Sequence, residues 1–233
     1  MVKQTSFAAS VDESKGVLVG VLTEIHPQSV SMVALDGYRL AVSTEKMNSG
    51  QENHFIISAK IINEISKIIA EDGDAEEVEI YLGKKKATFR IDTTEIVLRL
   101  MEGEYIKYRD IMPTQSTTDI VIGRAILQES IERASLLARE GKNNLIKMTI
   151  KNNLLTITSR SEEGNVKEEI IMEKEGEDLE IGFNSKFVID VLKVIDDDEI
   201  SMHFLTGTSP CMVKPVSGDA YEYLILPVRI PTM

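Results

Sequence analysis

Apolar residues recur along the chain with two different periods, and each change of period predicts a boundary between a strand and a helix. In residues 55–73, FIISAKIINEISKIIAEDG, isoleucines follow a period of about 3.6 residues and form one stripe, at positions 61, 62, 65, 68 and 69. Ser58 stands just before the stripe, and serine is a favoured N-cap residue. The pattern predicts an amphipathic helix over Ser58–Asp72 that follows the end of a strand.

The same pattern returns 126 residues further along, in residues 181–199, with Asn184 in the place of Ser58 as the expected N-cap. An acidic turn and then an alternating strand follow each helix, with apolar residues at Val78, Ile80 and Leu82 in one copy and at Ile200, Met202 and Phe204 in the other. This spacing indicates the duplication of a unit that is too long to be a solenoid repeat.

The segments ahead of these helices also correspond, because residues 18–37 and 144–164 each read as two strands around a polar turn. A short strand over Asp119–Ile122 and a long helix over Arg124–Glu140 precede the second copy. The equivalent positions of the first copy would fall before residue 1, so we expect that copy to lack its first strand and the start of its first helix.

The duplication predicts an α+β protein with two tandem domains, residues 1–113 and 114–233. The Pro, Ser and Thr residues of 112–118, MPTQSTT, are typical of a linker between them. Each domain is expected to carry two helices packed on mostly antiparallel sheets.

Composition then narrows the class of protein. The chain has 42% hydrophobic and 27% charged residues, which is ordinary for a folded globular protein. It contains no apolar run of the roughly 18 residues that a membrane span needs, and its first residues do not read as a signal peptide. These features predict a cytoplasmic protein that does not bind membranes.

The sequence offers little catalytic chemistry. It lacks a phosphate-binding glycine loop, a GxSxG elbow, HExxH and CxxC, and its three histidines are not at metal-ligand spacing. The carboxylates Asp36 and Asp92 are the strongest remaining enzyme candidates, but most carboxylates are solvated surface charges. Cys211 is a conceivable nucleophile, although its apolar neighbours favour a buried thiol. We expect no catalytic residue, no metal and no cofactor.

Basic residues on the predicted helices are the more suggestive feature. The net charge of −12 argues against a nucleic-acid grip over the whole surface. Yet Lys60 and Lys67 recur as Lys186 and Lys193, while Arg124, Arg133 and Arg139 belong to the long helix. Solvent-facing charges are the ordinary explanation of such residues. Their repetition favours a cationic surface shared by both copies.

Several stretches resemble the bacterial sliding clamp, the β subunit of DNA polymerase III. They are GVLVGVLTEI, MVALDGYRLAVS, RLMEGEYIKYRDIMP, IGFNSKFVIDVL and YLILPVRIP, beginning at residues 16, 32, 99, 181 and 223. Their order and spacing are similar to those of the family's middle and C-terminal domains along essentially the whole chain. The family's first domain has no counterpart here.

The resemblance implies a processivity factor of DNA replication rather than an enzyme. In that family two subunits of three domains form a closed ring around duplex DNA, with helices lining the hole. A homodimer and a nucleoid-associated location follow for the full-length protein. Its implied partners are sequence-independent duplex DNA, the DNA polymerase III α subunit, the clamp loader and other proteins with a clamp-binding peptide motif.

The resemblance also implies site residues. The family's partner pocket, between the middle and last domains, corresponds to Leu18, Leu35, Gly37, Tyr38, Arg39, Leu40, Ile111, Asn184, Phe187, Ser209, Cys211, Leu224, Ile225, Leu226, Pro227, Val228 and Arg229. The chain departs from the family pattern at Ile106, where proline is usual, and at Asp110, where a basic residue is common. Lys60 and Lys15 are the implied DNA-facing residues. An alternative is a truncated clamp that binds partner peptides but cannot close a ring.

Overall fold

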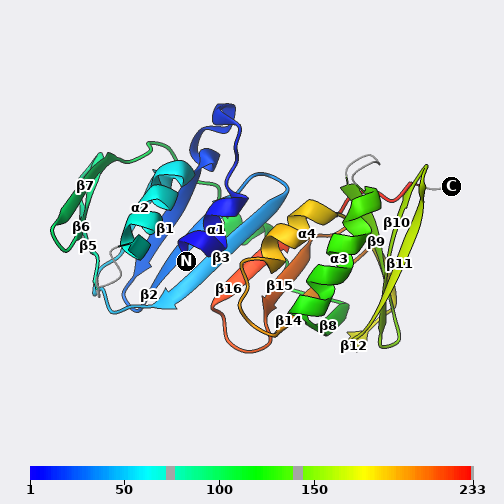
Figure 1. Cartoon of the computed structure of the whole chain (residues 1–233). Helices are drawn as coiled ribbons and strands as arrows, with labels where there is room; N and C mark the ends of the chain where they lie inside the picture. The colour runs from blue at the N-terminus through cyan, green and yellow to red at the C-terminus, as the bar shows by residue number, and fades with distance from the viewer. Residues whose placement is uncertain (72–76, 139–143, 232–233) are drawn as a thin grey trace. The chain divides into compact units, whose positions relative to one another are not determined.

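The computed structural model describes residues 1–71, 77–138 and 144–231 of the chain (Figure 1). The chain forms two compact units, Met1–Lys107 and Tyr108–Met233. Residues 108–113, which the sequence pattern assigned to the first domain, therefore group with the second unit. Within the described ranges no helix is both long and apolar enough to cross a membrane.

The first unit has two sheets and a layer of helices. Its elements are α1 (Val2–Thr5), η1 (Ser6–Ala8), η2 (Glu13–Val19), β1 (Gly20–His26), β2 (Ser29–Leu35), β3 (Arg39–Lys46), β4 (Asn53–Ser58), α2 (Ala59–Glu71), β5 (Glu79–Leu82), β6 (Lys86–Ile91) and β7 (Thr94–Arg99). The strand order β3-β2-β1-β4 is antiparallel throughout, and α1 and α2 lie on one face of that sheet (Figure 1). The strands β5-β6-β7 form a separate antiparallel sheet.

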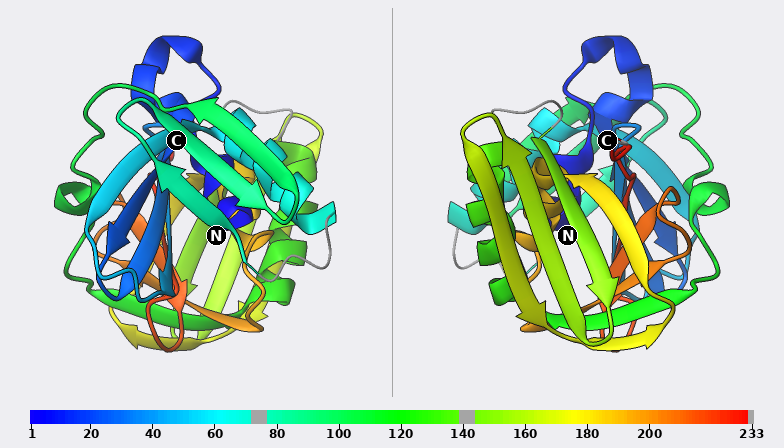
Figure 2. Two further views of the ribbon diagram at one scale, coloured as in Figure 1. Left: turned by 90° about the vertical axis from the view of Figure 1, so that its left-hand side faces the viewer. Right: turned by 90° about the vertical axis from the view of Figure 1, so that its right-hand side faces the viewer.

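The second unit repeats this plan. Its elements are η3 (Tyr108–Ile111), β8 (Thr118–Gly123), α3 (Arg124–Ala138), β9 (Leu145–Lys151), β10 (Leu154–Ser161), β11 (Gly164–Ile171), β12 (Glu173–Gly176), β13 (Leu179–Asn184), α4 (Ser185–Leu192), β14 (Glu199–Phe204), β15 (Cys211–Pro215) and β16 (Tyr221–Ile225). One antiparallel sheet has the order β11-β10-β9-β13, and its strands run side by side in the right-hand view of Figure 2. The strands β12, β8, β14, β15 and β16 pair in that order in the other sheet.

The two strand orders confirm the duplicated α+β plan. The sheet β3-β2-β1-β4 corresponds to β11-β10-β9-β13, and the run β5-β6-β7 corresponds to β14-β15-β16. Asn184 caps α4 as expected, because its side-chain oxygen accepts a hydrogen bond from the Lys186 amide at 3.0 Å. The last residues of the other two predicted helices, Asp72 and Arg139–Glu140, lie outside the described residues.

Each unit has its own apolar core. In the second unit, Phe183 of β13 and Leu127 and Ile131 of α3 have no exposed surface. In the first unit, Ile57 of β4 and Ile91 of β6 are 1% and 0% exposed. Burial of this kind supplies the main favourable free energy of folding, since each large apolar side chain contributes roughly 1.5–3 kcal/mol.

Candidate partner-binding and nucleic-acid surfaces

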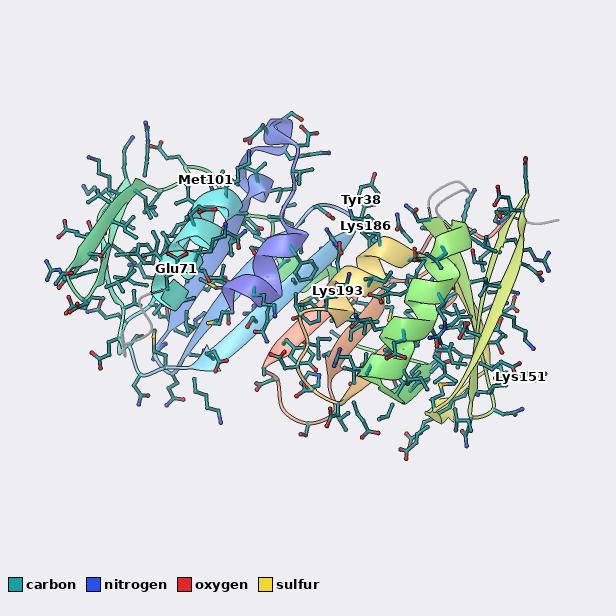
Figure 3. The ribbon with its side chains drawn as sticks, in the orientation of Figure 1. Tyr38, Glu71, Met101, Lys151, Lys186 and Lys193 are labelled. Carbon is teal, nitrogen blue, oxygen red and sulfur yellow. The ribbon has the colours of Figure 1, made fainter. Side chains whose placement is uncertain are left out.

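The turn between β2 and β3 is built by the residues that carry the family resemblance. The Asp36 carboxylate accepts hydrogen bonds from the backbone amides of Tyr38 and Arg39, at 2.8 and 3.1 Å. Gly37 has a φ of +95°, which residues with a side chain rarely adopt. Tyr38, next in the turn, is 61% exposed (Figure 3). The local sequence therefore fixes a tight turn that presents one aromatic ring.

Arg39 holds this turn to the rest of the unit. Its Nε donates to the Asp36 carboxylate at 3.1 Å, and its Nη2 donates to the Phe7 carbonyl at 2.9 Å. The guanidinium also lies over the Phe7 ring, 5.2 Å from its centroid. With its side chain only 10% exposed, Arg39 supports the turn from beneath.

The aliphatic residues expected around this turn have different exposures. Leu35 and Leu40 face each other across the hairpin and are 4% and 1% exposed, so they form its apolar base. Leu18, in η2, is half-buried. The first unit thus brings Gly37, Tyr38 and Arg39 together above two buried leucines.

The second unit places its expected residues on three elements. Phe187 is half-buried on α4, directly after Lys186, whose amide Asn184 caps. Ile111 ends η3 and is 50% exposed. Ser209 lies in the turn between β14 and β15, where its hydroxyl lies 2.7 Å from that of Thr206.

Three further residues of the expected set are core residues. Cys211 and Ile225 face each other across β15 and β16 with no exposed surface, and Leu224 is 3% exposed. Burial raises the pKa of the Cys211 thiol well above its ordinary value. Such a thiol stays protonated, which excludes Cys211 as a nucleophile in the folded protein.

The segment after β16 carries the accessible part of this set. Leu226, Pro227 and Val228 are half-buried, and Arg229 is exposed. The Val228 amide donates to the Gly182 carbonyl of β13 at 2.8 Å. A Cβ at position 182 would stand 2.7 Å from the Val228 carbonyl oxygen, so glycine is required for this approach.

The two expected DNA-facing lysines lie on neighbouring segments of the first unit. Lys60, in the first turn of α2, forms a 2.8 Å ion pair with Glu13 of η2, and both side chains are largely exposed. That contact raises the pKa of Lys60. Lys15 is exposed in the same short segment, next to Gly16 with its φ of +58°.

Carboxylates accompany most other helix cations. Arg133 of α3 binds Glu168 of β11 at 2.7 Å, and Lys193 lies 3.6 Å from Glu132. Lys67 pairs with Glu64 at 2.7 Å. Lys186 and Lys193 are labelled in Figure 3 at the two ends of α4. Arg139 lies outside the described residues.

The sequence pattern did not predict a row of hydrogen-bonded polar side chains formed by Asp119, His203 and Ser201. The His203 ring lies 2.7 Å from the Asp119 carboxylate through Nδ1 and 3.1 Å from the Ser201 hydroxyl through Nε2. The Ser201 hydroxyl, however, donates to the carbonyls of Lys214 and Pro215, at 3.1 and 3.2 Å, so its proton is not held by the imidazole. This row therefore lacks the activated hydroxyl of a hydrolase. Only the register, which sets His203 opposite Asp119, could have revealed it.

The carboxylates considered as enzyme candidates have other roles. Asp36 holds the β2–β3 turn, and Asp92 occupies the β6–β7 turn with a φ of +47°. Among the described residues, no group of three or more His, Cys, Asp or Glu side chains could hold a metal ion.

Comparisons with known proteins agree for both units. The family model "DNA polymerase III beta subunit, central domain" matches residues 1–107, and "DNA polymerase III beta subunit, C-terminal domain" matches residues 109–229. The beta sliding clamp of Staphylococcus epidermidis is 38% identical over 232 residues, which are 98% of this chain and 61% of that protein. The chain thus spans about 61% of the length of that curated relative.

Solved structures give the same result. The DNA polymerase III beta subunit of Thermotoga maritima aligns with a TM-score of 0.92 and 34% identity, over 99% of this chain and 62% of that one. The sliding clamp of Pseudomonas aeruginosa bound to griselimycin aligns with a TM-score of 0.92 and 28% identity, over 99% and 62% of the two chains.

Proposed function

Because the chain belongs to the DNA polymerase III beta subunit family, the β sliding clamps, we propose that it is a processivity factor of DNA replication. It acts by tethering, as an accessory subunit without catalytic activity, and works at the nucleoid in the cytoplasm. The observation that carries this proposal is the family match over both units, together with the hydrogen-bonded turn at Asp36–Arg39.

The tethering function requires binding of short peptide motifs from the DNA polymerase III α subunit, the clamp loader and other partners. Two groups of residues are proposed to bind them, Leu18, Leu35, Gly37, Tyr38, Arg39 and Leu40 in the first unit and Ile111, Asn184, Phe187, Ser209, Cys211 and Leu224–Arg229 in the second. The exposed or half-buried members, such as Tyr38, Phe187 and Leu226, are proposed to contact the peptide directly. Leu40, Cys211 and Ile225 support them from within the core. Apolar anchors of this type usually carry most of the binding energy.

We further propose that the protein binds duplex DNA without sequence preference and only weakly. The charges support this, because Lys60, Lys67 and Arg133 each have a carboxylate partner and the net charge is −12. Phosphate affinity rises with the number of cations that replace counterions. A clamp retained by topology needs few such contacts.

We also propose that the full-length protein assembles into a ring. The strand β11 is an edge of its sheet, and Ile171 at its end is 85% exposed. An open edge with an exposed apolar residue suits pairing with another chain, which supports a homodimer of the full-length clamp. The second candidate is a fragment that binds partner peptides without closing a ring.

Fluorescence anisotropy with a labelled peptide carrying a Gln-x-x-Leu-Phe-like motif tests the peptide proposal. Tyr38→Ala and Leu226→Ala should each weaken binding by more than about 1 kcal/mol, as truncation of an anchor does. Matched controls are Tyr81→Ala in the first unit, where the side chain is 51% exposed, and Leu154→Ala in the second, at 36%. If all four variants bound the peptide with equal affinity, Tyr38 and Leu226 would not be peptide-binding residues.

Retention on DNA separates the two candidates. A ring-forming clamp, loaded by its clamp loader, stays on closed circular duplex and is released when the circle is cut. A fragment is retained on neither form. Tight binding to linear duplex at physiological salt would contradict the weak-contact proposal, because it requires many free cations.

A further inference from the structure

Ion pairs neutralise many of the cations of the second unit. Six lysine and arginine side chains there lie 2.5–3.6 Å from a carboxylate oxygen, namely Arg133, Lys147, Lys167, Lys174, Lys193 and Lys214. Such internal pairing is easily formed in a chain with 38 acidic and 26 basic residues. A cation without a carboxylate partner instead keeps its charge for a molecule outside the chain.

Two exposed cations beside the proposed peptide-binding residues differ from these six. Lys186 directly precedes Phe187, and Arg229 directly follows Val228. Within residues 1–71, 77–138 and 144–231, neither Lys186 nor Arg229 forms an ion pair with a carboxylate. Their apolar neighbours are both half-buried and belong to the group proposed to bind partner peptides. Two uncompensated positive charges therefore border this group.

Backbone contacts bring Lys186 and Arg229 to one region of the second unit. The Val228 amide donates to the Gly182 carbonyl at 2.8 Å, and Arg229 is the next residue of the chain. The strand β13 continues beyond Gly182 into α4, whose first turn contains Lys186 (Figure 3). Only a few residues of backbone and one hydrogen bond thus join the two cations, so a short extended peptide can reach both.

The surroundings of Lys186 add to its positive charge. It stands at the N-terminal end of α4, where the helix dipole is positive, and the first turn of α4 contains no acidic residue. Glu180 of β13 is paired with Lys147 at 3.0 Å. Asp110, next to Ile111 on η3, is exposed and acidic. The positive surface is therefore limited to the start of α4 and the C-terminal segment.

We propose that Lys186 and Arg229 select partner peptides that carry acidic residues next to their apolar anchors. This inference rests on the proposed peptide-binding function and names the chemistry of its partner. The peptide carboxylates pair with the two cations, while the apolar anchors contact Phe187 and Leu226. Charge pairs at the rim of an interface discriminate between partners and raise the association rate. Lys186, which the family resemblance does not include, is thereby a specificity-determining residue.

Two labelled peptides test this preference on the full chain. Both carry the same Gln-x-x-Leu-Phe-like motif, flanked on each side by Asp-Asp in one peptide and by Asn-Asn, which has a similar shape without the charge, in the other. Fluorescence anisotropy measures the two affinities. The Asp-flanked peptide should bind about fivefold more tightly in about 50 mM salt, and the ratio should approach one in about 0.5 M salt, because salt screens exposed ion pairs.

Variants of the chain assign the preference to the two cations. Lys186→Gln should lower the affinity ratio of the two peptides to about twofold, and Lys186→Gln combined with Arg229→Gln should abolish the preference. Lys151→Gln is the matched control and should leave the ratio unchanged. Lys151 is also exposed and forms no ion pair with a described residue, but it ends β9, away from α4 (Figure 3).

Three outcomes would overturn the inference. They are equal binding of the two peptides at low salt, an equal fall of the ratio in Lys151→Gln and Lys186→Gln, and a loss of duplex-DNA binding in Lys186→Gln without a change in the ratio. The last would mean that the cation binds phosphate instead of a peptide. Failure of the chain to bind either peptide would contradict the peptide-binding function itself, a result that differs from equal binding of both.

Discussion

Strands β5 and β14 hold equivalent places in two copies of one plan, and their sequences carry the same alternation of apolar residues. Met202 of β14 is nevertheless 1% exposed and Ile80 of β5 is 43% exposed. The alternation sets which face of a strand points inward, whereas burial depends on what lies beside the strand. In the second unit β8 and α3 lie there, and they complete the core.

The turns that follow β2 and β10 make a second contrast. In the first unit Asp36 binds two backbone amides and the Arg39 guanidinium. In the second unit, the Glu163 amide donates to the Ser161 hydroxyl at 3.2 Å in the equivalent turn. The two equivalent turns are thus held by different side chains. Duplication preserved the fold while local contacts diverged.

The largest expected effect compares Met202→Ala with Ile80→Ala. Removing the buried Met202 side chain should cost about 2–4 kcal/mol, because it leaves a cavity in a closed core. Removing Ile80, which already contacts solvent, should cost about 1 kcal/mol or less. Hydrogen exchange at increasing urea concentration measures the free energy of unfolding of each unit separately. Equal losses would show that β5 is as well covered as β14.

A smaller effect is expected from Asp36→Ala and Ser161→Ala, which remove the first side chain of each turn. Asp36→Ala should cost about 2 kcal/mol, since it breaks several hydrogen bonds and leaves the largely buried Arg39 guanidinium without its carboxylate. Ser161→Ala should cost about 0.5–1 kcal/mol, the worth of one ordinary hydrogen bond. The same two variants, tested with the labelled peptide, should weaken its binding only in the case of Asp36→Ala.

The smallest effect concerns pH and the ion pair that joins α3 to β11. A hydrogen bond from Arg133 holds the pKa of Glu168 below its ordinary value. A depressed folded-state pKa contributes stability above the unfolded-state pKa, and this contribution is lost as pH falls through the folded-state value, beginning below about pH 5. Glu168→Gln should therefore destabilise the protein at pH 7 more than at pH 3. Thermal unfolding at the two pH values measures this difference.

The sequence was sufficient for the plan of the fold. The isoleucine stripe of residues 61–69 and its repeat predicted α2 and α4, and Asn184 caps α4 as expected. The spacing of the acidic turns predicted β5 and β14, and the fold class is confirmed. These features are local, so a periodic pattern is enough to indicate them.

Burial and pairing were beyond the sequence. Arg39 stays a predicted peptide-site residue, and the sequence pattern did not reveal its contact with Phe7, which is 32 positions away. Cys211 is buried, as its apolar neighbours indicated, whereas its pairing with the buried Ile225 across β15 and β16 depends on strand register. The meeting of His203 with Asp119 depends on strand register. Interactions between distant segments produce no periodic pattern in the sequence, so only the structure reveals them.

The reactivity of the chain's single cysteine can measure how often the second unit opens. Cys211 sits at zero exposure in the second unit, and burial keeps its thiol protonated. A thiol reagent can therefore modify the protein only during the moments when β15 is exposed. The modification rate counts openings of the second unit alone, while the first unit, which has no thiol, stays silent. Thiol modification of this chain thus reports the opening of the second unit without a signal from the first.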